Sequence, residues 1–128
     1  MGHFMNRYSA QAYSSMRIVA GLLFLCHGAQ KLFGFPVPMP AGAPAFIVYG
    51  AGSIEFFGGL LIAAGLFTNW AAFLCAGQMA AAYWIGHGTK AFFPLVNQGE
   101  LAVLYCFVFL YISANGPGIW SVDAARKK

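Results

Sequence analysis

Four long apolar segments, separated by short polar or proline- and glycine-rich stretches, dominate the pattern of the chain. They cover roughly Ser14 to Phe33, Ala45 to Phe67, Asn69 to Gly86 and Gln98 to Ala114. Each is close to the ~20 residues that a helix rising 1.5 Å per residue needs to cross ~30 Å of hydrocarbon. The ten-residue alternation of an outer-membrane barrel is missing. The pattern therefore predicts an all-α, integral membrane four-helix bundle.

The connections between these segments differ in character. The stretch from Gly34 to Pro44 holds four prolines, which predicts an extended cap on the membrane surface. Only Thr68 and Asn69 separate the second and third segments, so we expect a tight hairpin there. The stretch 87–97 carries two phenylalanines and a proline and is typical of an interfacial segment. Asn115-Gly-Pro-Gly118 predicts the end of the last helix. One domain, residues 14–114, then lies between the tails 1–13 and 115–128.

Composition agrees with a membrane protein and adds an orientation. Of the 128 residues 60% are hydrophobic and 8% charged, far below the ~25% charged residues of a soluble domain. The net charge of +4 forms no patch that would suit a nucleic acid. No cleavage site follows the first apolar segment, so we expect it to remain as a span. By the positive-inside rule both termini are cytoplasmic, because most basic residues lie near them: Arg7, Arg17, Arg126, Lys127 and Lys128, against Lys31 and Lys90 on the other side.

Two polar residues at membrane depth are the strongest functional candidates. A charged side chain there costs ~2.5 to 3.5 kcal/mol, so it needs a reason to be retained. Helical spacing places Arg17, Phe24, His27 and Lys31 on one face of the first segment. Glu55 stands among small residues of the second segment, which predicts that it points into the bundle. Glu55 and His27 are expected at equal depth, and a carboxylate that deep needs a proton or a cation.

The other polar residues each have a functional and a structural interpretation. Glu100 follows Asn97 at the spacing of a capping box, and Arg17 with Asp123 suits a cytoplasmic-side pair or headgroup contacts. Lys90 suits an interfacial anchor, and the flexible stem of Lys31 can bend either up to the interface as an anchor or toward the Glu55 carboxylate. His27 is either a ligand or proton-handling residue or a structural hydrogen-bonding residue. Gln78 lies opposite Tyr83 and His87 on the third segment, so only one of these faces can look inward. The polar residues of the predicted outer half are His27, Gln30, Lys31, Glu55, Tyr83, His87, Asn97 and Glu100, and those of the inner half are Arg17, Gln78 and Asp123.

Metal and nucleotide chemistry find little support. A bis-histidine haem would need His27 and His87, and His87 is expected in a loop. The three cysteines stand singly in three segments and are interpreted as small apolar residues. No phosphate-binding glycine motif or nucleophile elbow occurs. The sequence predicts no metal site.

Four stretches of the chain resemble the DoxX family of small four-helix membrane proteins. They are Arg17–Gly34, Ile54–Leu61, Asn97–Ala102 and Gly116–Asp123, in that order. The resemblance implies a multi-pass protein of the bacterial inner (cytoplasmic) membrane. It also implies a link to quinol oxidase or thiosulfate:quinone oxidoreductase systems, in which members are named as small subunits. The positions that match the family pattern are His27, Gln30, Lys31, Glu55, Asn97 and Glu100.

These observations lead to one hypothesis and two alternatives. We expect an accessory membrane subunit of a redox system, catalytic or not, that binds a quinone-like or other amphiphilic molecule in the outer half of the bundle. Glu55, with His27, would relay a proton, and electrons would come from a redox-enzyme partner. The alternatives are a proton-coupled exporter of small lipophilic molecules and a structural docking subunit; a homo-oligomer suits the glycine-rich second segment. The candidate ligand-binding residues are His27, Gln30, Lys31, Glu55, Tyr83, His87 and Glu100.

Overall fold

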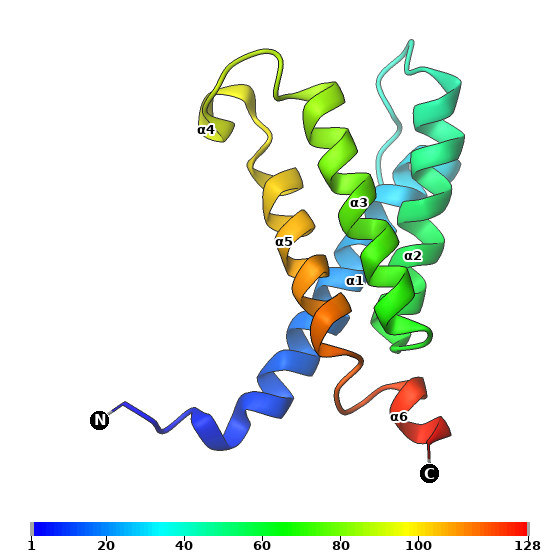
Figure 1. Cartoon of the computed structure of the whole chain (residues 1–128). Coiled ribbons are helices and arrows are strands. Elements are labelled where there is room, and N and C mark those ends of the chain that lie inside the picture. The colour runs from blue at the N-terminus through cyan, green and yellow to red at the C-terminus, as the bar shows by residue number, and fades with distance from the viewer. Residues whose placement is uncertain (1, 128) are drawn as a thin grey trace.

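A computed structural model describes residues 2–127, and it is helical (Figure 1). No strand occurs among these residues, which confirms the all-α prediction. Lys128, one of the basic residues used to predict orientation, lies outside the described part. In chain order the elements are η1 (Asn6–Tyr8), α1 (Ser9–Phe33), η2 (Phe46–Ala51), α2 (Gly52–Ala64), α3 (Thr68–Gly86), α4 (Pro94–Asn97), α5 (Glu100–Asn115) and α6 (Val122–Arg126).

Two stretches of continuous helix are long and apolar enough to cross a membrane. They are Asn6–Phe33, which joins η1 to α1, and Phe46–Ala64, which joins the π-helical turn η2 to α2. α5 is apolar but shorter, with 16 residues. Both termini and the α2–α3 turn lie at one end of the molecule, and the 34–45 loop and α4 lie at the other (Figure 1). We call these the terminal end and the loop end.

The long helices pack chiefly as two pairs, α1 with α2 and α3 with α5. Glycines bring the backbones of α1 and α2 together. A Cβ atom added to Gly21 would lie 2.6 Å from the amide nitrogen of Ala63, and one added to Gly59 would lie 2.6 Å from the carbonyl oxygen of Gly21. The small-residue face of α2 is therefore buried, as predicted, and Glu55 is buried on it.

A short core joins the two pairs. The ring of Phe24 on α1 lies 4.8 Å from that of Phe109 on α5, and Tyr105 stacks on Phe109 at 5.4 Å. Ile62 of α2 and Ile112 of α5 are fully buried beside them. These contacts join the α1–α2 pair to the α3–α5 pair.

The turn between α2 and α3 corrects the predicted hairpin. The connection is Gly65–Phe67, and Thr68 and Asn69 already belong to α3. Gly65 adopts the left-handed conformation at φ 72°, and the amide of Leu66 donates to the carbonyl of Leu61, which closes the last turn of α2. Gly65, as the C-cap of α2, therefore sets the boundary between α2 and the turn. The stop after α5 is confirmed, since that helix ends at Asn115 before Gly116.

The other boundaries differ at the helix starts. α1 begins at Ser9, five residues before the predicted start at Ser14, because no glycine or proline interrupts that stretch. α5 begins at Glu100 after the separate turn α4. The predicted capping box is wrong: Gly99 occupies the cap position, and the Asn97 side chain accepts from the Gly99 amide at 2.8 Å.

A buried arginine ties the terminal end together. Arg17 is 0% exposed and donates to four backbone carbonyls. Nη1 donates to Ile62 and Ala63 at the end of α2, both at 2.8 Å, and Nη2 donates to Ile119 at 3.1 Å and Trp120 at 2.8 Å. A cation at a helix C-terminus is favoured by the helix dipole. The expected pair of Arg17 with Asp123 is therefore wrong.

Asp123 has a different partner, the start of α3. Its Oδ1 accepts from the Phe67 amide at 3.1 Å, and its Oδ2 accepts from the amide and the hydroxyl of Thr68, both at 3.0 Å. Partial burial raises the pKa of this carboxyl group, but the hydrogen bonds from Thr68 and Phe67 and the charge of Arg126 outweigh it, so the pKa lies below its usual value. Asp123 is thus a cap for α3 supplied from 55 residues further along the chain.

Candidate functional site

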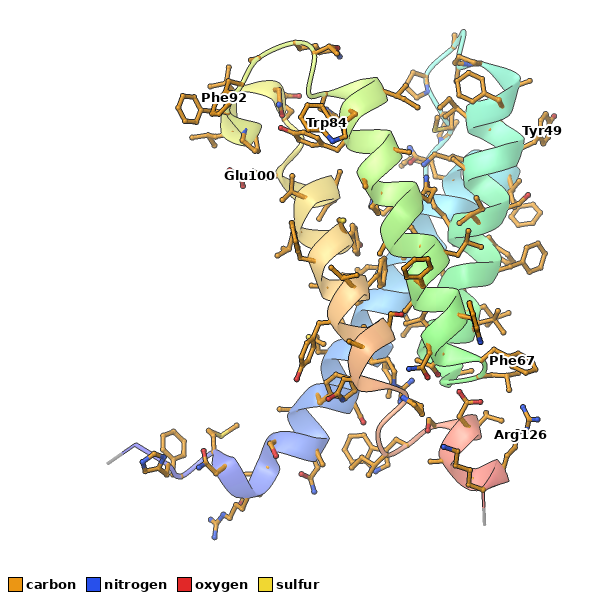
Figure 2. All side chains as sticks on the ribbon, viewed as in Figure 1. Tyr49, Phe67, Trp84, Phe92, Glu100 and Arg126 are labelled. Atoms are coloured by element: carbon orange, nitrogen blue, oxygen red, sulfur yellow. The ribbon has the colours of Figure 1, made fainter. Side chains whose placement is uncertain are left out.

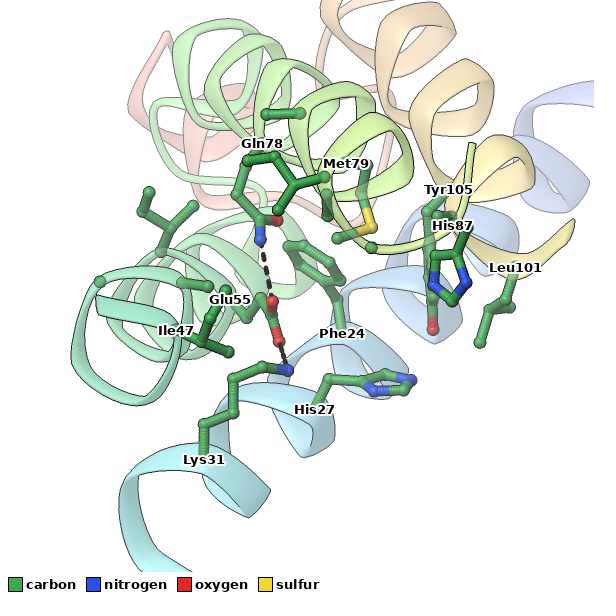
Figure 3. Close-up of a pocket in the computed structure, with 18 of the residues that line it drawn as sticks. Phe24, His27, Lys31, Ile47, Glu55, Gln78, Met79, His87, Leu101 and Tyr105 are labelled. Atoms are coloured by element: carbon green, nitrogen blue, oxygen red, sulfur yellow. Dashed lines mark hydrogen bonds and ion pairs between the residues drawn. The ribbon is translucent and has the colours of Figure 1, made fainter. Parts of the chain in front are cut away.

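Glu55 forms the centre of the candidate site. Its Oε1 accepts from Lys31 Nζ of α1 at 2.8 Å, and its Oε2 accepts from Gln78 Nε2 of α3 at 3.0 Å (Figure 3). The side chains of Glu55 and Lys31 are 3% and 14% exposed. This is the only ion pair between side chains in residues 2–127. Of the two positions open to Lys31, the stem bends toward the carboxylate and not to the interface, so the interfacial anchor is wrong for this residue.

A cavity of about 630 Å³ lies against this pair. It is bounded by α1, η2, α2, α3 and α5, and its wall is largely apolar, with Phe24 and Met79 next to the polar groups. Lining residues such as Phe46 and Ile85 are themselves exposed, so the cavity reaches the surface of the described chain near the loop end. Its volume falls within the ~300–1,000 Å³ of ordinary ligand pockets.

Further polar side chains line the cavity, among them those of His27, His87 and Tyr105. The His27 ring packs edge-on against Tyr105, with centroids 5.9 Å apart. His87, which directly follows α3, lines the same cavity, and its Nδ1 lies 3.0 Å from the carbonyl oxygen of Asn97. In Figure 3 His27 lies between Lys31 and the pair formed by His87 and Tyr105. The structure thus brings His27, Lys31, Glu55 and His87 to one cavity.

Gln78 and Tyr105 are site residues that sequence reasoning missed. Gln78 was placed in the inner half, yet it contacts Glu55. The hairpin contains the missing signal, since Glu55 and Gln78 lie about equally far along the chain from the Gly65–Phe67 turn and so reach the same depth. Tyr105 shares one face of α5 with Phe109 and Ile112, all of them buried, and that spacing marks it as an inward-facing hydroxyl.

Three predicted site residues do not line this cavity. Gln30 is half-buried elsewhere on α1. The Tyr83 hydroxyl accepts from the buried Asn97 side chain at 3.0 Å and so braces the turn before α5. Glu100 is exposed and points away from the bundle (Figure 2). The apparent conflict between faces of α3 is resolved: Gln78 looks into the bundle, Tyr83 looks toward α4, and His87 returns to the cavity from the end of the helix.

Comparison with known proteins places this arrangement in a family. The family model described as DoxX matches residues 12–88, a stretch that contains Lys31, Glu55 and Gln78. The chain belongs to the DoxX family. A protein of Haemophilus influenzae with the name "Uncharacterized protein" is 38% identical over 125 residues, 93% of each chain.

A second relative carries a functional name. The Bacillus subtilis protein named "Putative oxidoreductase CatD" is 27% identical over 112 residues, 84% of this chain and 81% of its own length. No solved structure matches the chain significantly. DoxX is a membrane family, which agrees with the two apolar helices described above.

The DoxX cavity combines a neutralised charge pair with free polar groups. Lys31 cancels the charge of Glu55, so the wall favours a neutral molecule over an ion. The Lys31 ammonium group can donate hydrogen bonds, the rings of His27 and His87 can donate or accept them, and the Tyr105 hydroxyl can do both. Residues 2–127 hold no group of three or more potential metal ligands. The arrangement suits a molecule with a polar ring and an apolar remainder.

Proposed function

We propose that this DoxX protein is a membrane-embedded accessory subunit of a redox system and binds a quinone-like amphiphile at Glu55. In this proposal α1, η2–α2, α3 and α5 cross the bacterial inner membrane and both termini are cytoplasmic. The observation that carries the proposal is the buried Lys31–Glu55 pair, 2.8 Å long, at the wall of an otherwise apolar cavity of about 630 Å³. The relative named as an oxidoreductase supports the redox assignment.

The cavity offers a place for each part of such a ligand. A ring carbonyl would accept from Lys31 Nζ or His27, and the ring would pack on Phe24 and Met79. An apolar tail would leave past the exposed side chains of Phe46 and Ile85. Because those side chains would face lipid in the proposed orientation, the ligand could enter from the bilayer without crossing water.

Glu55 would exchange the proton and a partner would exchange the electrons. Reducing a quinone to a quinol takes up two electrons and two protons. Glu55 and His27 both lie at the cavity and have acid–base chemistry, so they would handle protons. The electrons would come from a partner oxidoreductase. Between proton transfers the Lys31 ammonium group would neutralise the ionised Glu55 carboxylate and so lower the free-energy cost of its burial.

Quinone content and quinone binding of the purified full chain test the proposal. We expect quinone to co-extract with the protein in mild detergent and a short-chain quinone to bind to the quinone-free protein. Glu55→Gln and Lys31→Met should weaken that binding at least tenfold. Glu100→Gln and Lys90→Met are the matched controls, because both wild-type side chains are exposed and lie outside the cavity.

The alternatives give different results. A preparation that contains no quinone and binds none on addition would rule out the quinone proposal. Proton-driven efflux of lipophilic molecules that Glu55→Gln abolishes would favour an exporter. If Glu55→Gln and His27→Ala left ligand content and partner interactions unchanged, a structural docking subunit would be the better description.

A further inference from the structure

A second cavity lies at the terminal end, between the start of α3 and α6. Its volume is about 500 Å³. None of the residues of the Glu55 cavity takes part in it. The lining residues are Phe67, Thr68, Asn69, Trp70, Pro117, Asp123, Arg126 and Lys127.

The charges around this cavity leave a positive surplus. The Asp123 carboxylate uses both oxygens to cap α3. Neither Arg126 nor Lys127 has a carboxylate partner within the part of the chain that the structure describes. The Arg126 guanidinium lies 5.3 Å from the centroid of the Phe67 ring, which holds it at the cavity (Figure 2). Two cations and one carboxylate, whose oxygens already accept hydrogen bonds from the start of α3, leave a net positive charge that favours the binding of an anion.

The surroundings of the two cations are apolar and continue along α3. Trp70 is 80% exposed, although it lines the cavity. Phe73 and Leu74, on the next turn of α3, are exposed as well. Tryptophan with arginine or lysine at the end of an apolar helix is typical of the interface between headgroups and acyl chains. An anion bound here would therefore have a hydrocarbon-binding surface beside it.

We propose that this cavity binds the headgroup of an anionic phospholipid. Arg126 and Lys127 hold the phosphate, and the acyl chains lie along Trp70, Phe73 and Leu74 of α3. A free phosphate ion shares the charge chemistry but gains nothing from the apolar surface. A bound lipid links α6 to α3 and so reinforces the Asp123 cap. This site is separate from the quinone site and does not depend on it.

Thermal unfolding of the full chain in a neutral detergent, with dioleoyl-phosphatidylglycerol as the probe, tests the proposal. We expect the lipid to raise the Tm of the wild type by several degrees. Arg126→Ala/Lys127→Ala should lose most of this increase and bind the lipid at least tenfold more weakly. The control Arg7→Ala/Lys90→Ala, which removes the same charge from exposed sites elsewhere, should respond like the wild type.

Further arms distinguish the possible ligands. Dioleoyl-phosphatidylcholine and inorganic phosphate should both leave the Tm unchanged. Equal phosphatidylglycerol effects in the two double variants would overturn the proposal, because the attraction would then be unspecific. An equal effect of inorganic phosphate would overturn the lipid assignment. If the double variant is unstable, Lys127→Glu alone should reduce the lipid count per protein in native mass spectrometry; an unchanged count would contradict the site.

Discussion

The two ends of the molecule each bury a charge, and they do so in opposite ways. At the terminal end Arg17 donates to four carbonyl groups and is fully buried. At the loop end Glu55 is neutralised by Lys31 next to a cavity. Carbonyl acceptors at helix ends are fixed by the backbone, so the first arrangement is suited to holding segments together. A paired carboxylate beside free volume is suited to a ligand. The comparison teaches that the surroundings of a buried charge, more than its burial, indicate its role.

The comparison predicts its largest effect on stability at Arg17. Arg17→Ala removes the four hydrogen bonds that tie α1 to the end of α2 and to residues 119–120. We expect a loss of about 3 kcal/mol in the free energy of unfolding. Unfolding in detergent measures it. Arg7→Ala, which removes an exposed arginine from the same helical stretch, is the control and should change little; equal effects of the two variants would remove the distinction between the ends.

A second prediction concerns the helix crossing that supports both ends. Gly59→Ala should destabilise the protein by about 2 kcal/mol, because the added methyl group meets the backbone of Gly21 and Leu25. Gly77→Ala is the control, since a Cβ atom there meets nothing within 4 Å. It should leave stability unchanged or raise it slightly. The same unfolding measurement applies, and a neutral Gly59→Ala would show that the α1–α2 contact is looser than described.

Substitutions of the buried pair at the loop end should change ligand binding more than they change stability. Replacing the pair together, by Lys31→Met with Glu55→Leu, removes two buried charges and leaves apolar side chains of similar size. Such replacements are often neutral or stabilising by ~1–4 kcal/mol. We therefore expect a folded protein with an equal or higher Tm that has lost quinone binding. A large loss of stability, comparable to that of Arg17→Ala, would show that the pair is structural.

The smallest effect is a pH dependence at Asp123. The pKa of Asp123 in the folded state lies below the usual 3.8. The ionised carboxylate therefore contributes its full stabilisation of the folded state above pH 3.8, and this stabilisation is lost as the pH falls through the folded-state pKa. The group is half-buried, so solvent screens part of the effect. Asp123→Asn should lower Tm at pH 7 by roughly 2 °C. The difference in Tm from the wild type should shrink below pH 4; a constant difference down to pH 3 would contradict this role.

The sequence predicted the helices better than the contacts of their polar residues. Apolar length and the proline and glycine stops determine where the helices lie, and the face shared by Phe24, His27 and Lys31 follows from helical spacing. The partner of Glu55 on α3 did not follow, because it depends on which residue makes the turn. Treating Thr68 and Asn69 as the turn instead of Gly65–Phe67 obscured the equal distances of Glu55 and Gln78 from it.

Long-range partners explain the other errors. Arg17 pairs with carbonyl groups, which every residue carries, so no side-chain pattern could indicate Ile119 or Trp120 as its acceptors. Asn97 resembles a helix cap locally, but contacts with Tyr83 and His87 decide its position. For Lys31 the sequence left the interface and the Glu55 carboxylate both open, and the depth of Glu55 in the packed bundle decides for the carboxylate.

The four bonds of Arg17 also bear on how the protein matures. Two of its acceptors, Ile119 and Trp120, follow Arg17 by 102 and 103 residues along the chain, so they are synthesised well after it. During synthesis the guanidinium group therefore lacks two of its four acceptors until these residues have been made. A nascent chain that stops before Ile119 would expose an incomplete arginine site, a defect that membrane quality control could recognise.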